Sequence, residues 1–343
     1  MRNMVLAAAL LLAAGMPASA DESCPPLTIV TSLDMKIGNS GRPFVPTQIG
    51  GTQEYMLVDT GGFFAELTQT AVSALQLTAH RAPLKLIGVS GMTTSTSVSA
   101  AFAMGNLRAD DADFMVAPAE LKFDHDLPGA GGIIAPNLLM SYDVDFDFAN
   151  RKFNLLSQKH CDGKVVYWQT DVLSVLPMIV TREFHIKVPV KLDGHDYMAT
   201  LDTGASNTTL NLDRAMRDFP LKPGDADTPA RGSLTSDPET ATYTHRFQSL
   251  ALEGIAVSNP LIMLVPDLVS GKMHHSTDPL ISHSRPRADE DAGLPDMILG
   301  MDILHRLHLY IAYKEKKLYV SPAAAAAAPQ PPPTASGAPA PLH

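Results

Sequence analysis

The chain is poor in positive charge. Its 343 residues include 26 Lys or Arg against 36 Asp or Glu, which gives a formal net charge of −10. Binding to nucleic acid requires a basic face that neutralises phosphates, and no cluster of Lys and Arg stands out in the sequence. The composition therefore argues against nucleic acid and against acidic membranes as partners, and it leaves open both an enzyme and a binding module.

The sequence also lacks an apolar run long enough to cross a bilayer. The run at residues 5–14 is too short for a membrane span. It follows the positive charge of Arg2 and precedes the small residues Ala18-Ser19-Ala20, a pattern typical of a secretory signal. We therefore predict a signal peptide at residues 1–20 and an exported protein, periplasmic or secreted, that begins near Asp21.

Cysteine is scarce, since the chain holds only Cys24 and Cys161. An exported protein meets an oxidising compartment, where two such residues form a disulfide. We expect this bond to tie the start of the mature chain to the end of its first half. The alternative is a pair of free thiols.

Two segments have the composition of loops or linkers. Residues 323–343 are rich in Ala and Pro without apolar periodicity, so we expect a disordered tail. Residues 267–295 contain His274-His275, several prolines and several acids, which is typical of a surface loop. Together with His283 these histidines match no familiar ligand spacing, and we predict neither a metal nor a cofactor.

The main feature of the sequence is an internal repeat. Two blocks recur in the same order, the first with an offset of 143 residues and the second with an offset of 165. The first block is Val45-Pro46, Gly51 and Asp59-Thr60-Gly61, matched by Val188-Pro189, Gly194 and Asp202-Thr203-Gly204. The second is Ile134-Ala135-Pro136-Asn137-Leu138-Leu139, matched by Leu299-Gly300-Met301-Asp302-Ile303-Leu304. The repeat indicates two duplicated lobes, at residues 21–165 and 166–322.

Each lobe is predicted to be rich in β-strands. Residues 186–192 alternate apolar and polar side chains, and a turn signal at Asp193-Gly194 precedes a second apolar strand that runs into Asp202. Short helices are expected at residues 66–77 and 212–219, where apolar residues have helical spacing. The fold class is therefore all-β, with two lobes in tandem.

A single Asp-Thr-Gly is weak evidence because these residues are common in turns. Two copies, each after an aliphatic strand and each at the same place in its repeat, are more specific. The arrangement resembles the pepsin-like and retropepsin-like aspartic peptidases over about residues 36–322. The resemblance implies that Asp59 and Asp202 meet in a cleft between the lobes as a catalytic pair, with an extended peptide or protein as substrate.

Paired carboxylates explain the chemistry. Two carboxyl groups in contact cannot both ionise cheaply, so they share one proton, and one acts as base while the other acts as acid. A water between them is thereby activated without a metal ion. The resemblance further implies that Thr60 and Thr203 bond across the axis, while Gly61 and Gly204 allow close approach of the backbone.

A hairpin flap is expected over the cleft in such enzymes. In the first half, Gly88 and Gly91 lie where the tip of this flap would be, and glycines suit a mobile tip. An ordinary glycine-containing hairpin is the alternative.

The first lobe departs from the family pattern at two positions. Gly62 follows Asp-Thr-Gly where Ser, Thr or Ala is usual, and Ala135 stands where Gly is usual. These changes keep open a second hypothesis, a weakened or inactive peptide-binding protein on the same scaffold. A third keeps the enzyme but pairs equivalent lobes of two chains. Tandem duplication favours the monomer.

Three acids alternate with apolar residues near the end of the first half, at Asp143, Asp145 and Asp147. Such alternation could indicate a cation site. Period two is also the pattern of a strand, and we expect one here with Val144 and Phe146 turned inward.

Overall fold

The computed structural model describes residues 24–87, 93–119, 121–233, 240–266 and 296–323. The predicted signal peptide, the candidate flap glycines Gly88 and Gly91, the segment 267–295 and the tail from residue 324 lie outside these ranges, and those predictions remain predictions.

Within the described residues, the first half of the chain forms an eight-stranded sheet. Its strands, in order across the sheet, are β2 (Lys36–Ile37), β3 (Pro43–Ile49), β4 (Thr52–Val58), β9 (Ala130–Ile134), β5 (Glu66–Leu67), β8 (Leu107–Val116), β7 (Thr93–Met104) and β6 (His80–Ile87). Two short helices accompany this sheet, α1 (Gln69–Ala74) and α2 (Pro136–Leu139).

The second half repeats this plan in a ten-stranded sheet, again counted over the described residues. Its strands in order are β17 (Ala230–Ser233), β18 (Ala241–Arg246), β21 (Leu261–Val265), β16 (Thr209–Asn211), β22 (Met297–Leu299), β15 (His195–Leu201), β14 (Ile186–Leu192), β19 (Ser249–Leu252) and β20 (Ile255–Ser258), and β13 (Ile179–Val180) pairs with β14. The helices here are α3 (Leu212–Asp218) and α6 (Met301–Leu304).

The hairpins β3–β4 and β14–β15 show why the repeat folds twice in the same way. The apolar residues of β14 alternate into the core, with Ile186, Val188 and Leu192 fully buried. The turn signal at Asp193-Gly194 takes positive φ at both residues, 43° and 89°, as a tight two-residue hairpin requires. Each hairpin thus ends in a strand that leads into an Asp-Thr-Gly loop.

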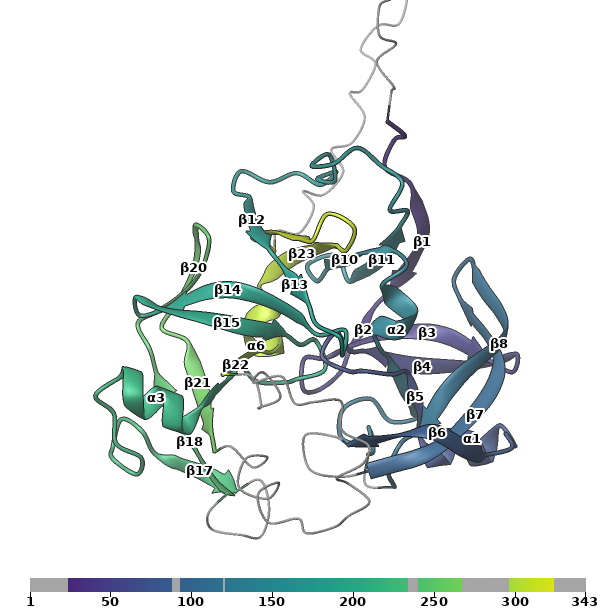
Figure 1. The fold of residues 1–343 in the computed structure, drawn as a ribbon, viewed down its shortest axis with the longest axis horizontal. Helices are drawn as coiled ribbons and strands as arrows, with labels where there is room; N and C mark the ends of the chain where they lie inside the picture. The colour runs from purple at the N-terminus through teal and green to yellow at the C-terminus, as the bar shows by residue number, and fades with distance from the viewer. Residues whose placement is uncertain (1–23, 88–92, 120, 234–239, 267–295, 324–343) are drawn as a thin grey trace, which may run out of the picture.

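A third sheet joins the two halves. Its six strands among the described residues are, in order, β1 (Ile29–Asp34), β11 (Lys152–Leu156), β10 (Asp143–Asp147), β23 (Leu307–Ala312), β24 (Lys317–Pro322) and β12 (Ser174–Pro177). The halves meet where β10 pairs antiparallel with β23, placing Phe146 opposite Leu309. In Figure 1 the first half lies to the right, the second to the left, and this joining sheet above them.

The first expected helix begins later than predicted. Residues 66–67 form strand β5, and α1 starts only after Thr68, whose side chain accepts a hydrogen bond from the Ala71 N–H. The helical spacing of apolar residues gave no sign of this N-cap. The cap at Thr68 determines where the helix begins. The second expected helix is present as α3.

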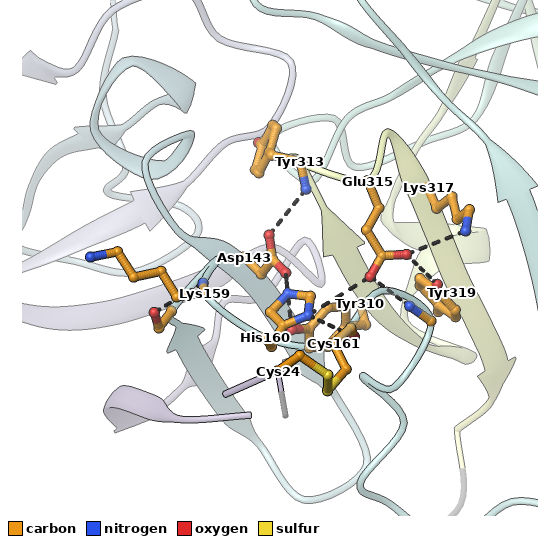
Figure 2. Close-up of polar contacts among 12 residues, drawn as sticks. Cys24, Asp143, Lys159, His160, Cys161, Tyr310, Tyr313, Glu315, Lys317 and Tyr319 are labelled. Atoms are coloured by element: carbon orange, nitrogen blue, oxygen red, sulfur yellow. Dashed lines mark hydrogen bonds and ion pairs between the residues drawn. A yellow bond between two sulfur atoms is a disulfide. The ribbon is translucent and has the colours of Figure 1, made fainter. Parts of the chain in front are cut away.

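Strand β10 is present, but its acidic face is not solvent-facing. Asp143 and Asp145 are both fully buried. Asp143 accepts hydrogen bonds from the Tyr310 hydroxyl and the Tyr313 N–H and lies 2.7 Å from Nε2 of His160, as Figure 2 shows. Alternation along one strand does not reveal that β23 and the segment after β11 supply polar partners to cover this face.

The His160 imidazole is a buried polar group in this network. Burial opposes its charge, but its bond to the Cys161 carbonyl and the nearby carboxylate of Asp143 raise its pKa above the ordinary value. A buried charge needs such partners, so the joining sheet depends on a satisfied polar cluster as well as on apolar packing.

The predicted disulfide between Cys24 and Cys161 is present. It adjoins His160 in Figure 2 and ties the start of the described chain to the segment after β11. Its two cysteines are 137 residues apart, so it closes a loop that includes most of the first half.

Candidate active site

The two aspartates lie at equivalent places in the two lobes. Asp59 directly follows β4, which pairs in parallel with β9, and its N–H donates to the Ile134 carbonyl at 2.9 Å. Asp202 directly follows β15, which pairs in parallel with β22, and its N–H donates to the Leu299 carbonyl at 3.0 Å. The two blocks of the repeat therefore meet in each lobe. The strand that leads into the second block, β9 or β22, positions the aspartate of the first block.

The two threonines bind the lobes to each other. The Thr60 N–H donates to Oγ1 of Thr203 at 3.1 Å, and the Thr203 N–H donates to Oγ1 of Thr60 at 3.0 Å. The Thr60 hydroxyl donates to the Leu201 carbonyl at 2.8 Å, and the Thr203 hydroxyl to that of Val58 at 2.6 Å. Both threonines are fully buried. This reciprocal set places the loops about a pseudo-two-fold axis.

The glycines of the two loops allow the close approach. A Cβ on Gly61 would lie 2.3 Å from Cγ of Asp202, and a Cβ on Gly204 would lie 2.4 Å from Cγ of Asp59. Such separations are far below van der Waals contact. Each glycine therefore packs against the carboxyl group of the opposite lobe, where no side chain fits.

The two carboxyl groups lie close enough for each to alter the pKa of the other. Oδ1 of Asp59 also accepts from the N–H groups of Gly61 and Gly62, at 2.9 and 2.8 Å. Oδ1 of Asp202 accepts from Gly204 and Ala205, at 2.8 and 3.0 Å. Both are acceptors held by main-chain amides, so a bond between the two side chains requires a proton on one of them.

Burial raises the pKa of both aspartates above the ordinary value. For Asp202 the rise is large, because the neighbouring charge of Asp59 adds to the effect of burial. For Asp59 the bonds from Gly61 and Gly62 oppose the effect of burial without cancelling it. The arrangement favours a singly protonated pair that titrates as a unit.

The two departures from the family pattern lie in contact with each other. A Cβ on Gly62 would lie 3.3 Å from Cβ of Ala135 and 3.2 Å from Oδ2 of Asp59. The second lobe has the opposite arrangement, Ala205 in the loop and Gly300 after the strand. The small and the larger residue have therefore exchanged places between the lobes, and the Ala135 methyl occupies space that Gly62 leaves free.

Arg42 is a residue of this site that the motifs did not indicate. Its Nε lies 2.7 Å from Oδ2 of Asp126 and 3.0 Å from the Ser40 hydroxyl oxygen. Its Nη1 lies 3.4 Å from the carbonyl oxygen of Gly204, in the opposite lobe. The guanidinium charge also acts on Asp59, where it favours the ionised form and so lowers the pKa.

Glu66 is a third carboxyl group near the pair. It lies on β5, seven residues after Asp59, and is half-buried. Burial, followed by the charge of Asp59, raises the pKa of Glu66 to about 7. A carboxyl group at this place was not predicted, because residues 66–77 were expected to begin a helix.

A segment of the second lobe reaches the first aspartate loop. The ring of Phe184 stacks on that of Phe63, with centroids 5.3 Å apart. The adjacent His185 is thereby placed beside the same loop, where the main chain of Gly61 favours the protonated form of its ring. Burial lowers the pKa of His185, although the charges of Glu183 and Asp59 oppose this.

A hollow of about 730 Å³ lies between the lobes beside these loops. The first lobe lines it with Ile37 and Gly41, and the second with Ser206, Met301 and His305. Neither aspartate lines it. Among the described residues, no group of three or more His, Cys, Asp or Glu side chains is arranged to hold a metal ion.

Comparison with known proteins agrees with this geometry. Residues 188–303 match the aspartyl protease family, and this stretch contains the second Asp-Thr-Gly loop. Together with the two mutually bonded loops, the match defines a two-lobed aspartic peptidase fold.

Two similar solved structures are basic 7S globulin from soybean and an aspartic proteinase from Irpex lacteus. The first has 11% identity and a TM-score of 0.46, with 88% of this chain and 97% of that chain covered. The second has 16% identity and a TM-score of 0.46, with 85% and 96% covered. No curated protein matches the chain.

Proposed function

We propose that this protein is an aspartic endopeptidase in which Asp59 and Asp202 together activate a water molecule. The observation that carries the proposal is a pair of half-buried carboxyl groups, one from each lobe, that alter the pKa of each other and accept hydrogen bonds from main-chain amides. The family match of the second lobe supports it.

The shared proton sets the order of events. The ionised aspartate takes a proton from water as the water oxygen attacks the scissile carbonyl carbon, and the protonated aspartate donates to the carbonyl oxygen. Collapse of the tetrahedral intermediate breaks the C–N bond, and the leaving nitrogen takes up a proton from the pair. The main-chain amides hold one oxygen of each carboxyl group, so the pair meets the substrate already oriented.

The inactive-scaffold hypothesis rested on Gly62 and Ala135. Their mutual fit supports catalysis instead, because Ala135 takes up space beside Gly62 without displacing Asp59 from its two amide donors. The substrate remains a peptide or protein, and the protein acts as a monomer because both aspartates come from one chain.

The proposal includes an exported location, in the periplasm or outside the cell. The disulfide between Cys24 and Cys161 supports it, since such bonds persist in oxidising compartments. None of the helices among the described residues has the length and apolar character needed to cross a membrane.

The test is cleavage of a mixed peptide library by the purified protein, from acidic to neutral pH. Asp59→Asn and Asp202→Asn should each lower the rate by about 10²–10⁴-fold, because each removes one member of the acid–base pair. Asp196→Asn is the matched control, because Asp196 lies on β15, the strand that leads into Asp202, and its side chain is exposed. Parent-like rates in both active-site variants would rule out the shared pair.

A further inference from the structure

The two lobes share a turn that the sequence repeat does not reveal. In the first lobe the Gly38 N–H donates to the Arg42 carbonyl and the Gly41 N–H to that of Gly38, both at 2.9 Å. In the second lobe the Thr181 N–H donates to the His185 carbonyl at 2.9 Å, and the Phe184 N–H donates to that of Thr181 at 3.1 Å.

The two turns are related by the offset of the first block. Residues 38, 41 and 42 correspond to residues 181, 184 and 185, each pair 143 positions apart. The backbone agrees, because φ is +84° at Gly41 and +67° at Phe184. The side chains share no identity at these positions, so only the structure shows that Arg42 and His185 are equivalent.

The last residue of each turn reaches the aspartate loop of the other lobe. Arg42 donates from Nη1 to the Gly204 carbonyl oxygen. His185 follows Phe184, whose ring stacks on Phe63 of the first aspartate loop, and the main chain of Gly61 there favours the protonated form of the His185 ring, as a carbonyl oxygen does. Gly61 and Gly204 are themselves 143 positions apart. Arg42 and His185 therefore each act on the equivalent glycine of the opposite lobe.

Each contact acts on a catalytic carboxyl group through one peptide unit. The carbonyl of Gly204 belongs to the amide whose N–H, on Ala205, donates to Oδ1 of Asp202. The carbonyl of Gly61 belongs to the amide whose N–H, on Gly62, donates to Oδ1 of Asp59. A donor on the oxygen of an amide strengthens donation by its N–H, because bonds in a chain polarise one another.

The backbone at Phe184 indicates that this contact is maintained against strain. A non-glycine residue with φ of +67° is uncommon, and its cost is tolerated where surrounding contacts hold it. The contact here is the stacking of Phe184 on Phe63, in the first aspartate loop. It fixes the position of the adjacent His185.

The groups that surround the two side chains give them different charges. Arg42 faces Asp126, the Ser40 hydroxyl and the ring of Phe123, its charge also acts on Asp59 of its own lobe, and its guanidinium stays charged.

His185 faces Glu183 and Lys187 from its own segment and Asp59 from the opposite lobe. Burial holds its ring neutral until the pH falls below the ordinary range of histidine. The equivalent contact in one lobe is therefore permanently cationic, while that in the other lobe gains its charge only in acid.

We propose that Arg42 and His185 are paired positioning residues, each of which orients and polarises the aspartate loop of the opposite lobe. This inference rests on the proposed peptidase function. It implies that the two carboxyl groups have unequal surroundings. Protonation of His185 in acid should strengthen its interaction with the loop that carries Asp59.

The first test is the pH profile of kcat/KM for Arg42 variants. Arg42→Gln removes a cation that favours the ionised aspartates, so both limbs of the profile should move to higher pH, by about one unit. Arg42→Lys keeps the charge but cannot bond Asp126 and Gly204 together, so it should keep the profile in place and lower kcat. Arg217→Gln, exposed on α3, is the control for loss of positive charge.

His185 variants should act in the opposite direction. His185→Arg places a permanent cation at the equivalent position and should move the profile to lower pH. His185→Gln keeps a hydrogen-bond donor but cannot become charged. The acid limb of the kcat/KM profile should therefore move to higher pH while the basic limb stays in place, so that the profile becomes narrower. A merely structural role would lower kcat in these variants without opposite shifts.

The inference is overturned if Arg42→Gln and His185→Arg both keep the pH profile of the parent. Carboxyl titration followed by ¹³C NMR, with Asp59→Asn and Asp202→Asn for assignment, provides a readout without substrate. If the parent cleaves no peptide, the proposed function fails, while opposite shifts of the carboxyl titration in the two variants would still support the cross-lobe contacts.

Discussion

The exchange of Gly62 and Ala135 between the lobes makes a sharp test of packing at the active site. Gly62→Ala alone would place a methyl 3.3 Å from that of Ala135 and 3.2 Å from Oδ2 of Asp59, and both contacts are tighter than normal. Ala135→Gly alone would leave a methyl-sized gap at a fully buried position. The double variant moves the methyl from one residue to the other, which is the arrangement of Ala205 and Gly300.

The magnitudes follow from these contacts. Overpacking by Gly62→Ala costs about 1–3 kcal/mol of unfolding free energy. Ala135→Gly loses about 0.8 kcal/mol for the buried methyl and about 0.5–1 kcal/mol for backbone entropy. The double variant should be more stable than the sum of the two losses predicts, by about 1 kcal/mol or more, because the clash between the methyl groups is gone.

Urea unfolding at neutral pH measures the three variants against the parent. Activity assays should show the larger loss in Gly62→Ala, whose methyl also presses on Asp59, and partial recovery in the double variant. Losses that add within about 0.5 kcal/mol would refute the contact between these two positions.

Two further predictions concern pH. The raised pKa of Glu66 means that the folded protein resists its ionisation, so stability falls as pH rises from 4.5 to about 7. Glu66→Gln should therefore be more stable than the parent above that range, by about 2–3 kcal/mol, and equal to it in acid, and equal curves in thermal unfolding at both pH values would contradict this. The raised pKa of His160 beside Asp143 contributes stability that is fully present below pH 6.5 and is lost as pH rises through its folded value. His160→Gln should flatten that dependence in urea unfolding, and an unchanged slope would contradict the assignment.

The sequence was sufficient to predict the all-β class, the disulfide and the close approach of the two Asp-Thr-Gly loops. The prediction for the two loops rests on identical residues that recur at a fixed offset, and that for the disulfide rests on the presence of two cysteines. Asp59 and Asp202 were identifiable as candidates because the same tripeptide stands at the same place in both copies of the repeat.

The remaining site residues were hidden for physical reasons. Arg42 and His185 occupy the same turn, but the turn is fixed by main-chain bonds, which leave its side chains free to diverge. Glu66 was hidden because the helix was predicted to begin at residue 66, whereas it begins only after Thr68. Asp143 is buried by partners more than 160 residues away in the sequence, such as Tyr310. The local sequence around Asp143 therefore could not predict its burial.

The sheet that joins the lobes sets a limit on how the chain can be divided. A cut between the halves would separate β10 from β23 and leave each piece with an unpaired strand edge, beside side chains as apolar as Phe146 and Leu309. Exposed edges of this kind pair with whatever strand they meet, including a second copy of themselves. The disulfide does not span the cut, because both cysteines belong to the first half. We therefore expect the two similar lobes to fold together and not as separable domains.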